Sequence, residues 1–305
     1  MRLKITEIAH PNDNSISILS FNRLTFLKFS GMRKYIIPID FSDTSKNAAR
    51  FAVQMASEIP GCELVLFHSF DQVVAGSDGT PMADDPQART TISLAALENV
   101  KDEVSGNSDI VIRCIASEGS FRDTLDKLIA EENADMVVMG INGATRLEQV
   151  MIGSSTLGTI HHTLCPVMII PTDAVYKKIK TVVYACDMKD VEHTTPLKNL
   201  RKMLKTFQPK LYIANVDTEH YVEITEEYQK EKATMNELLQ GFEPEYAFIR
   251  LFDFADAINQ FALDRNADLI ITVPRKHSFL SSLFTTSHTK KLAYHSHLPV
   301  LAIHE

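Results

Sequence analysis

The sequence predicts two α/β domains in tandem, each with a five-stranded parallel sheet covered by helices on both faces. Three observations support this fold class. The chain has 305 residues, a natural length for two domains of about 150 residues each. Short apolar runs alternate with segments of helical periodicity, which is typical of right-handed parallel crossovers. The second half of the chain also repeats the first half.

The predicted strands are short apolar runs bounded by turn-forming residues. In the first half they fall at 35–39, 63–67, 110–116, 136–139 and 167–170. In the second half they fall near 180–185, 210–215, 246–251, 269–272 and 300–303. Their spacing leaves room for a helix after each strand, as a parallel sheet requires.

The predicted helices of the first half follow these strands. The first helix should begin near Ser42, Asp43 and Thr44, which are all good N-cap residues. Within it, Ala48, Phe51, Ala52 and Met55 recur at helical spacing. Further helices are predicted around 88–103, 121–131 and 154–163.

The internal repeat is clearest near the end of each half. Residues 136–170 and 269–303 align without a gap, and each segment follows an Asn-Ala-Asp triplet and ends in a Pro-Val run. The starts correspond as well, with Asp40 of YIIPIDFSD aligned with Asp187 of VVYACDMKD. A repeat of this length indicates a duplicated domain rather than a solenoid of short units.

The domain boundaries follow from the repeat. We predict a first domain over 32–171 and a second over 178–305. Residues 1–31 precede the regular patterning and are interpreted as an N-terminal extension or a mis-assigned start, without the features of a signal peptide. The Pro-Val runs, 166–171 and 299–303, have the character of apolar edge strands, which tend to pair. We expect them to pair with each other and form an intrachain pseudo-dimer.

Composition excludes several classes of protein. Apolar residues make up 45% and charged residues 23%, as in ordinary globular chains rather than disordered or coiled-coil ones. The net charge is −8 and no basic face is apparent, so no nucleic-acid partner is expected. No stretch approaches the roughly 18–20 apolar residues of a membrane helix, so no membrane partner is expected either.

Cysteine and histidine usage does not indicate a metal site. Cys62, Cys114, Cys165 and Cys186 lie far apart without a C-x-x-C motif, which suggests reduced, buried thiols in a cytoplasmic protein. The histidines at 161–162, 295 and 297 lie in different halves and do not predict a zinc site.

Glycine is distributed unequally between the halves. Ten of the 11 glycines lie at or before Gly158, and the second half keeps only Gly241. Glycine is needed where the backbone must approach a ligand closely or take positive φ. The first half is therefore predicted to carry a ligand site that its copy lacks.

The predicted ligand site combines a glycine pair with a helix start. Gly140 ends the fourth strand, and ligands of open α/β sheets bind beyond the carboxyl ends of strands. Gly140 and Gly143 allow loop amides to face a phosphate chain. Gly153 precedes a helix whose free amides and positive dipole end favour an anion. Ser154 and Ser155 add hydroxyl donors or cap this helix.

Two charged residues complete the predicted site. Asp40 ends the first strand at the same sheet edge, where it can accept from ribose hydroxyls or hold a hydrated Mg²⁺ through water. An N-cap role for Asp40 stays open. Arg146 is the single Lys or Arg between residues 136 and 175, and it either neutralises phosphate or is solvated at the surface. Together these residues predict a nucleotide, with its sugar at Asp40 and its phosphates near 140–155.

The pattern G-x-x-G-x(9)-G-[S/T] at Gly140, Gly143, Gly153 and Ser154, with an aspartate after the first strand, resembles the universal stress protein family in its ATP-binding branch. The resemblance covers 32–305 as a tandem pair. It implies a five-stranded, adenine nucleotide alpha hydrolase-like fold, binding of ATP or AMP, a cytoplasmic location and dimerisation through the fifth strand.

The resemblance also implies which residues contact the nucleoside. Adenosine would be lined by Pro38, Ile39 and Asp40, with help from the backbone of Ser69 and Met139. In the second half the aligned motif positions are Val273, Lys276, Thr286 and Ser287. Every motif glycine is therefore missing there, and only the aspartate remains.

Three functional hypotheses follow. The leading one is an ATP- or AMP-binding universal stress protein that acts as a nucleotide-responsive stress or regulatory module. The second is a pseudo-dimer scaffold that recruits a protein partner without a nucleotide, and the third is a slow ATPase. The segment lacks a P-loop lysine and has one arginine, which disfavours rapid phosphoryl transfer. Further assembly into a homo-oligomer stays open.

Overall fold

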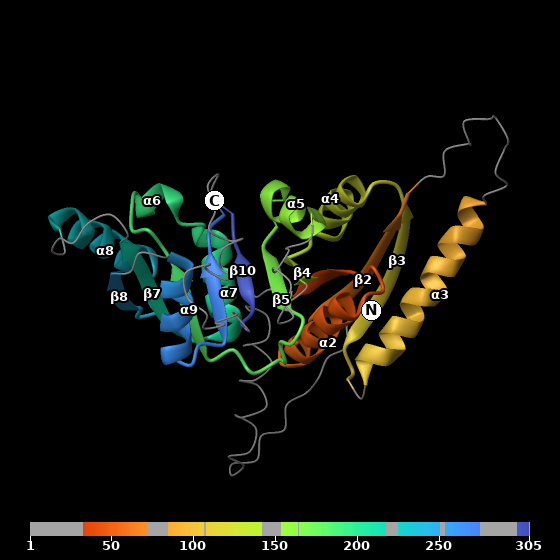
Figure 1. The fold of residues 1–305 in the computed structure, drawn as a ribbon, viewed down its shortest axis with the longest axis horizontal. Helices are drawn as coiled ribbons and strands as arrows, with labels where there is room; N and C mark the ends of the chain where they lie inside the picture. The colour runs from red at the N-terminus through yellow and green to blue at the C-terminus, as the bar shows by residue number, and fades with distance from the viewer. Residues whose placement is uncertain are drawn as a thin grey trace, which may run out of the picture. The chain divides into compact units, whose positions relative to one another are not determined.

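The computed structural model describes residues 33–71, 85–106, 108–141, 154–163, 165–217, 225–250, 254–274 and 298–304. The strands are β1 (Lys34–Pro38), β2 (Glu63–Phe70), β3 (Val111–Glu118), β4 (Met136–Ile141), β5 (Val167–Pro171), β6 (Thr181–Ala185), β7 (Lys210–Asp217), β8 (Glu245–Arg250), β9 (Leu269–Thr272) and β10 (Val300–Ala302). The helices are α2 (Asp43–Ser57), α3 (Pro86–Ser105), α4 (Phe121–Glu132), α5 (Ser154–His162), α6 (Val191–Thr194), α7 (Leu197–Phe207), α8 (Glu226–Leu238) and α9 (Phe254–Asp264). The predicted alternation of strands and helices is confirmed (Figure 1). The interpretation of residues 1–31 lies outside the described residues.

The ten strands form one sheet in the order β3-β2-β1-β4-β5-β10-β9-β6-β7-β8. Each half contributes five parallel strands in the same relative order. The halves join where β5 and β10 pair antiparallel, with Leu301 opposite Met168. The predicted pairing of the two Pro-Val runs within one chain is therefore confirmed.

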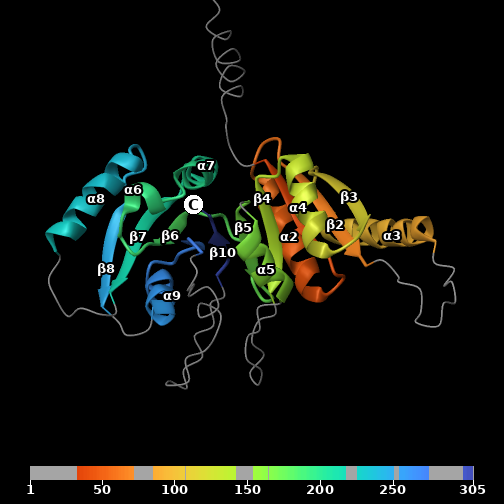
Figure 2. The same ribbon diagram turned by 90° about the horizontal axis from the view of Figure 1, so that it is seen from above.

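Helices cover both faces of the sheet, as predicted. Successive side chains of a strand point to opposite faces, so the apolar strands present apolar side chains on both faces for helices to bury. Tyr35 and Ile37 belong to a core that also includes side chains of α2 and α3, whereas Ile36 packs with side chains of α4 on the other face. Figure 2 shows helices flanking the strands of each half.

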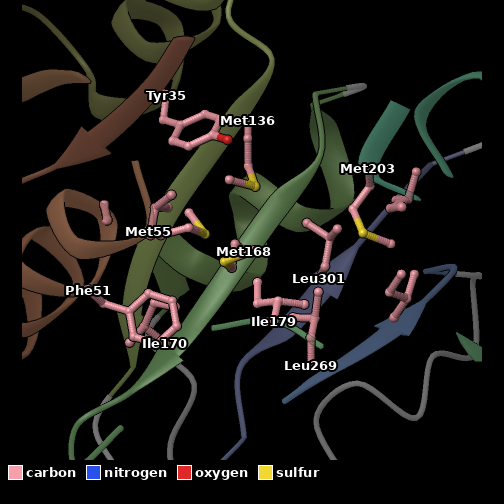
Figure 3. Close-up of a cluster of buried hydrophobic side chains, with 14 of the residues drawn as sticks. Tyr35, Phe51, Met55, Met136, Met168, Ile170, Ile179, Met203, Leu269 and Leu301 are labelled. Carbon is pink, nitrogen blue, oxygen red and sulfur yellow. The ribbon is translucent and has the colours of Figure 1, made fainter. Parts of the chain in front are cut away.

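The seam between the halves is apolar and buried. Met168 of β5 and Leu301 of β10 are both 0% exposed and belong to one core cluster. Figure 3 shows Met136 and Met55 beside Met168, and Met203 of α7 beside Leu301. This core includes side chains from both halves, so the duplication buries surface that a single domain would expose.

The repeated Asn-Ala-Asp triplet has the same structural role in both halves. Asn133 and Asn266 follow α4 and α9 in the left-handed conformation, at φ 48° and 49°, which asparagine tolerates well. Asp135 Oδ2 accepts from two successive amides at the start of β1, at 2.7 and 3.1 Å. Asp268 Oδ2 does the same at the start of β6, at 2.8 and 2.9 Å. The triplet ends a helix and fixes the neighbouring strand.

A charge network lies at the amino ends of the strands of the first half. Glu132, at the end of α4, accepts from Arg113 Nη1 at 3.1 Å and from Lys34 Nζ at 2.9 Å. Hydrogen bonds from Arg113 and then Lys34 lower the pKa of Glu132 to about 2. The folded protein therefore prefers the ionised form of Glu132. The hydrogen bonds to this carboxylate stabilise the folded state fully above the pKa of Glu132 in the unfolded chain, and that stabilisation is lost as the pH falls toward 2.

We expect Glu132→Gln to lower the free energy of unfolding by about 1 kcal/mol at pH 7, a value reduced for solvent screening because the Arg113 side chain is 41% exposed. The difference from wild type should begin to shrink below about pH 4.5, where Glu132 becomes protonated in the unfolded chain, be clearly smaller at pH 3, and vanish as the pH falls through about 2, where the folded-state carboxylate is protonated as well. Urea unfolding at pH 7, 5 and 3 measures it. Glu131→Gln on the same helix is the control, since its ion pair with Lys127 is exposed. An equal difference at pH 7 and pH 3 would contradict this account.

Candidate functional site

A pocket of about 360 Å³ opens at the carboxyl ends of β1, β2 and β4. It lies where the chain order reverses between β1 and β4, the position at which open α/β sheets bind ligands. Its volume falls within the range of small-molecule sites, about 300–1,000 Å³. The lining residues are Pro38, Ile39, Asp40, Ser42, Thr44, Ser45, Phe67, His68, Ser69, Phe121, Met139, Gly140, Ile141 and Thr156.

The structure brings six predicted site residues together around this pocket: Pro38, Ile39, Asp40, Ser69, Met139 and Gly140. They come from the ends of three different strands. The predicted residues Gly143, Arg146 and Gly153 lie outside the described residues. Ser154 and Ser155 form the start of α5, as expected from the sequence, and only their backbone is described. Their role in nucleotide binding stays a prediction.

The amino terminus of α2 forms one wall of the pocket. Ser42 is the N-cap, and its Oγ accepts from Ser45 N at 3.2 Å. Asp40 Oδ1 accepts from Ser42 N at 3.0 Å and from Ser42 Oγ at 2.6 Å. Asp40 is therefore not the cap itself but orients the residue that is. This places a capped helix start, with its positive dipole end, beside the pocket.

Asp40 is ionised at neutral pH. Partial burial alone would raise the pKa of Asp40, but hydrogen bonds from Ser42 and Ser45 outweigh that effect and hold the pKa below its ordinary value. The pocket therefore presents a carboxylate that can accept hydrogen bonds from ligand hydroxyls. Among the described residues that line the pocket, Asp40 is the one carboxylate.

The described residues do not form a metal site of their own. Among them, no group of three or more His, Cys, Asp or Glu side chains could hold a metal ion. Mg²⁺ prefers oxygen ligands and often takes several of them from phosphate and water. Asp40 together with nucleotide phosphates would fit such a mixed site, whereas Asp40 alone would not.

Gly140 is required by packing rather than by backbone conformation. A Cβ at this position would lie 2.7 Å from Thr44 Cγ2 and 2.8 Å from the Thr44 carbonyl carbon. The missing side chain lets the start of α2 approach β4 closely. Phosphate access is the reason predicted for this glycine from its position in the motif, and close packing of Thr44 against β4 is a second reason, visible in the structure. At the equivalent position the second half has Val273, which is 8% exposed.

His68 is a pocket residue that the sequence analysis missed. Its Nδ1 lies 2.7 Å from the carbonyl oxygen of Ile39, and its ring packs on Phe41 with centroids 4.6 Å apart. Because a carbonyl oxygen can only accept, Nδ1 donates, and Nε2 is the acceptor in the neutral ring. The signal was present in the sequence, since His68 directly precedes the predicted Ser69.

The other lining residues outside the prediction share no single motif. They are Ser42, Thr44, Ser45, Phe67, Phe121, Ile141 and Thr156. Phe121 and Thr156 come from the first turns of α4 and α5, so only the tertiary arrangement brings them to the pocket.

The corresponding edge of the second half is built differently. Asp187 Oδ1 accepts from Lys189 N at 3.2 Å, and Met188 is left-handed at φ 52°, as Phe41 is at φ 65°. The helix that follows is divided, because α6 has four residues and Pro196 precedes α7. Asp190, the N-cap of α6, makes no side-chain capping hydrogen bond. The aspartate is therefore retained without the long capped helix that accompanies it in the first half.

Comparisons with known proteins agree with this architecture. Residues 32–171 and 181–304 each match the universal stress protein family. Universal stress protein MJ0531 of Methanocaldococcus jannaschii is 28% identical over 142 residues, which cover 45% of this chain and 81% of that protein. Universal stress protein MJ0577 of the same organism is 23% identical over 154 residues, which cover 45% and 94%.

A solved structure matches nearly the whole length. The crystal structure of a universal stress protein from Archaeoglobus fulgidus has a TM-score of 0.66 and covers 91% of this chain and 99% of its own. At 17% identity this likeness shows the fold alone. Separately, none of the helices in the described part of the chain is long and apolar enough to span a membrane.

Proposed function

The chain belongs to the universal stress protein family, and from this premise we propose that its first half binds an adenine nucleotide, ATP or AMP, as a nucleotide-responsive stress or regulatory module. The observation that supports this most is the pocket at the switch point of the first half. Six residues predicted for nucleotide binding meet there, five of them expected to contact the nucleoside and Gly140 expected near the phosphates, beside a capped helix start.

The lining residues divide into two chemical groups that suit a nucleoside. Ile39, Phe67 and Met139 provide apolar surface for a base. Asp40 provides a carboxylate for ribose hydroxyls, and a hydrogen bond to a charged acceptor contributes about 1.5–3 kcal/mol. This combination of mostly apolar walls with a few polar groups is typical of small-molecule sites.

The phosphates would extend toward α5. Thr156, in the first turn of this helix, lines the pocket, so the amino terminus of α5 borders it. Free amides at a helix start and its positive dipole end stabilise an anion. Bound Mg²⁺ would neutralise phosphate charge, and in the alternative arrangement Asp40 would hold the hydrated ion through water instead of accepting from the ribose hydroxyls.

Thermal unfolding with Mg²⁺ and either ATP or AMP tests the proposal. Saturating ligand at about 100 times Kd should stabilise the protein by about 2.7 kcal/mol and raise the melting temperature. Mass spectrometry of small molecules released from the purified protein adds an independent readout. A melting temperature unchanged by both nucleotides would contradict the proposal.

A pair of variants places the nucleotide in the first half. Asp40→Asn should raise the Kd for ATP by about tenfold or more, because the lost charge weakens a hydrogen bond to the ligand. Asp187→Asn, at the equivalent position of the second half, should leave that Kd unchanged. Isothermal titration calorimetry measures both values. An equal rise in the Kd for ATP in both variants, or a rise only in Asp187→Asn, would contradict a nucleotide site confined to the first half.

A further inference from the structure

We propose that residues 172–178, the strap between β5 and β6, dock on α2 in a manner that is thermodynamically linked to nucleotide occupancy of the first-half pocket. The inference rests on the proposed function and extends it, because it names the segment through which binding is communicated. The elements that hold the strap are the same elements that form the pocket walls.

The strap is attached along the length of α2. Asn47 Nδ2 donates to the carbonyl oxygen of Pro171, the last residue of β5, at 3.2 Å, and to that of Ala174, in the strap, at 3.1 Å. Asn47 lies one turn after Thr44 and Ser45, which line the pocket. The same helix therefore forms a wall of the pocket at its start and holds the strap about one turn later.

Two further contacts continue along this helix. Tyr176 packs edge-on against Phe51, with ring centroids 5.2 Å apart at 89°. Lys178 Nζ lies 3.6 Å from Glu58 Oε2, at the C-cap of α2. The docked strap thus follows α2 from its second turn to its end.

A separate hydrogen bond joins the strap to the other wall. Thr172 Oγ1 donates to the carbonyl oxygen of Ile141 at 2.8 Å. Ile141 is the last residue of β4 and lines the pocket. The close approach of Gly140 to Thr44 fixes this end of β4 against α2. Both walls of the pocket are therefore bonded to the strap.

Linkage follows from this shared support. A nucleotide that contacts α2 and the end of β4 favours the arrangement of these elements in which the strap is docked. Energetic coupling between two sites is reciprocal, so release of the strap must weaken nucleotide binding by the same factor. Such factors commonly lie between about 5 and 150.

Hydrogen exchange of the full-length protein, with and without Mg-ATP, tests the linkage. In wild type we expect the amides of residues 172–178 to exchange at least about fivefold more slowly with ATP bound. Asn47→Ala and Tyr176→Ala remove two different strap contacts, and neither residue lines the pocket. Both variants should reduce the ATP effect on strap exchange to less than about twofold and raise the Kd for ATP by about fivefold.

Gln54→Ala is the matched control, because Gln54 is an exposed residue of α2. It should retain the wild-type ATP effect and Kd. Wild-type protein that binds ATP without a change in strap exchange would overturn the linkage and leave the proposed function intact. Variants with wild-type Kd and wild-type protection would also overturn it. Wild-type protein that does not bind ATP or AMP would overturn the proposed function, and the linkage with it.

Discussion

Replacing Gly140 by alanine is expected to lower the free energy of unfolding by about 2 kcal/mol and to weaken ATP binding by more than tenfold. The new Cβ would lie 2.7 Å from Thr44 Cγ2 and 2.8 Å from a Thr44 backbone atom. Backbone cannot rotate away as a side-chain tip can, so the start of α2 must move off β4. Overpacking of this kind typically costs about 1–3 kcal/mol. Displacement of this helix start also moves the Asp40–Ser42 pair that lines the pocket.

Gly158→Ala is the matched control. Among the described residues, no atom outside the adjacent residues and the backbone of the helix itself lies within 4 Å of a Cβ built at Gly158, which is inside α5. Alanine there should be neutral or stabilise the protein by up to about 1 kcal/mol, since glycine is unfavourable in a helix interior. Urea unfolding and calorimetric titration with ATP measure both effects. A Gly140→Ala protein as stable as Gly158→Ala would show that α2 does not depend on this close approach.

Much of the fold was accessible from the sequence because its signals are local. Apolar runs and helical spacing are properties of short segments, and they located the strands within a few residues. The internal repeat supplied the long-range information that single segments lack. It predicted that two equivalent apolar edges would meet, and β5 and β10 pair accordingly.

The candidate site was only partly accessible from the sequence. Asp40 and Ser69 could be placed because the ends of parallel strands meet at one sheet edge. Phe121 and Thr156 could not, since they reach the pocket from helices whose orientation depends on packing. The packing requirement for glycine at position 140 could not be predicted either, because it arises from contact with Thr44, which is distant in sequence.

The strap illustrates a further limit. The predicted domain boundaries leave residues 172–177 as a connection between the two domains, and such a connection carries no sequence pattern that says which element it docks on. Asn47 lies on a predicted helix with no feature that distinguishes it from other polar residues. Its hydrogen bonds to the carbonyl oxygens of Pro171, at the end of β5, and of Ala174, in the strap, appear only in the folded chain.

The second large effect is expected at the seam between the halves. Leu301→Ala should lower the free energy of unfolding by about 2–5 kcal/mol, because it removes a fully buried side chain and leaves a cavity. Leu301 pairs with Met168 across β5 and β10, in a core built from both halves. Leu263→Ala is the same chemical change at a side chain that is 41% exposed, and it should cost less than about 1 kcal/mol.

Hydrogen exchange then distinguishes one cooperative unit from two. If the shared core makes the halves unfold together, Leu301→Ala should accelerate exchange in β1 and β7 by the same factor, about tenfold for each 1.4 kcal/mol lost. Faster exchange confined to β7 would mean that the first half keeps its stability without the seam. In that case the first half would fold as an independent domain, and packing against the second half would not be needed for the stability of its core.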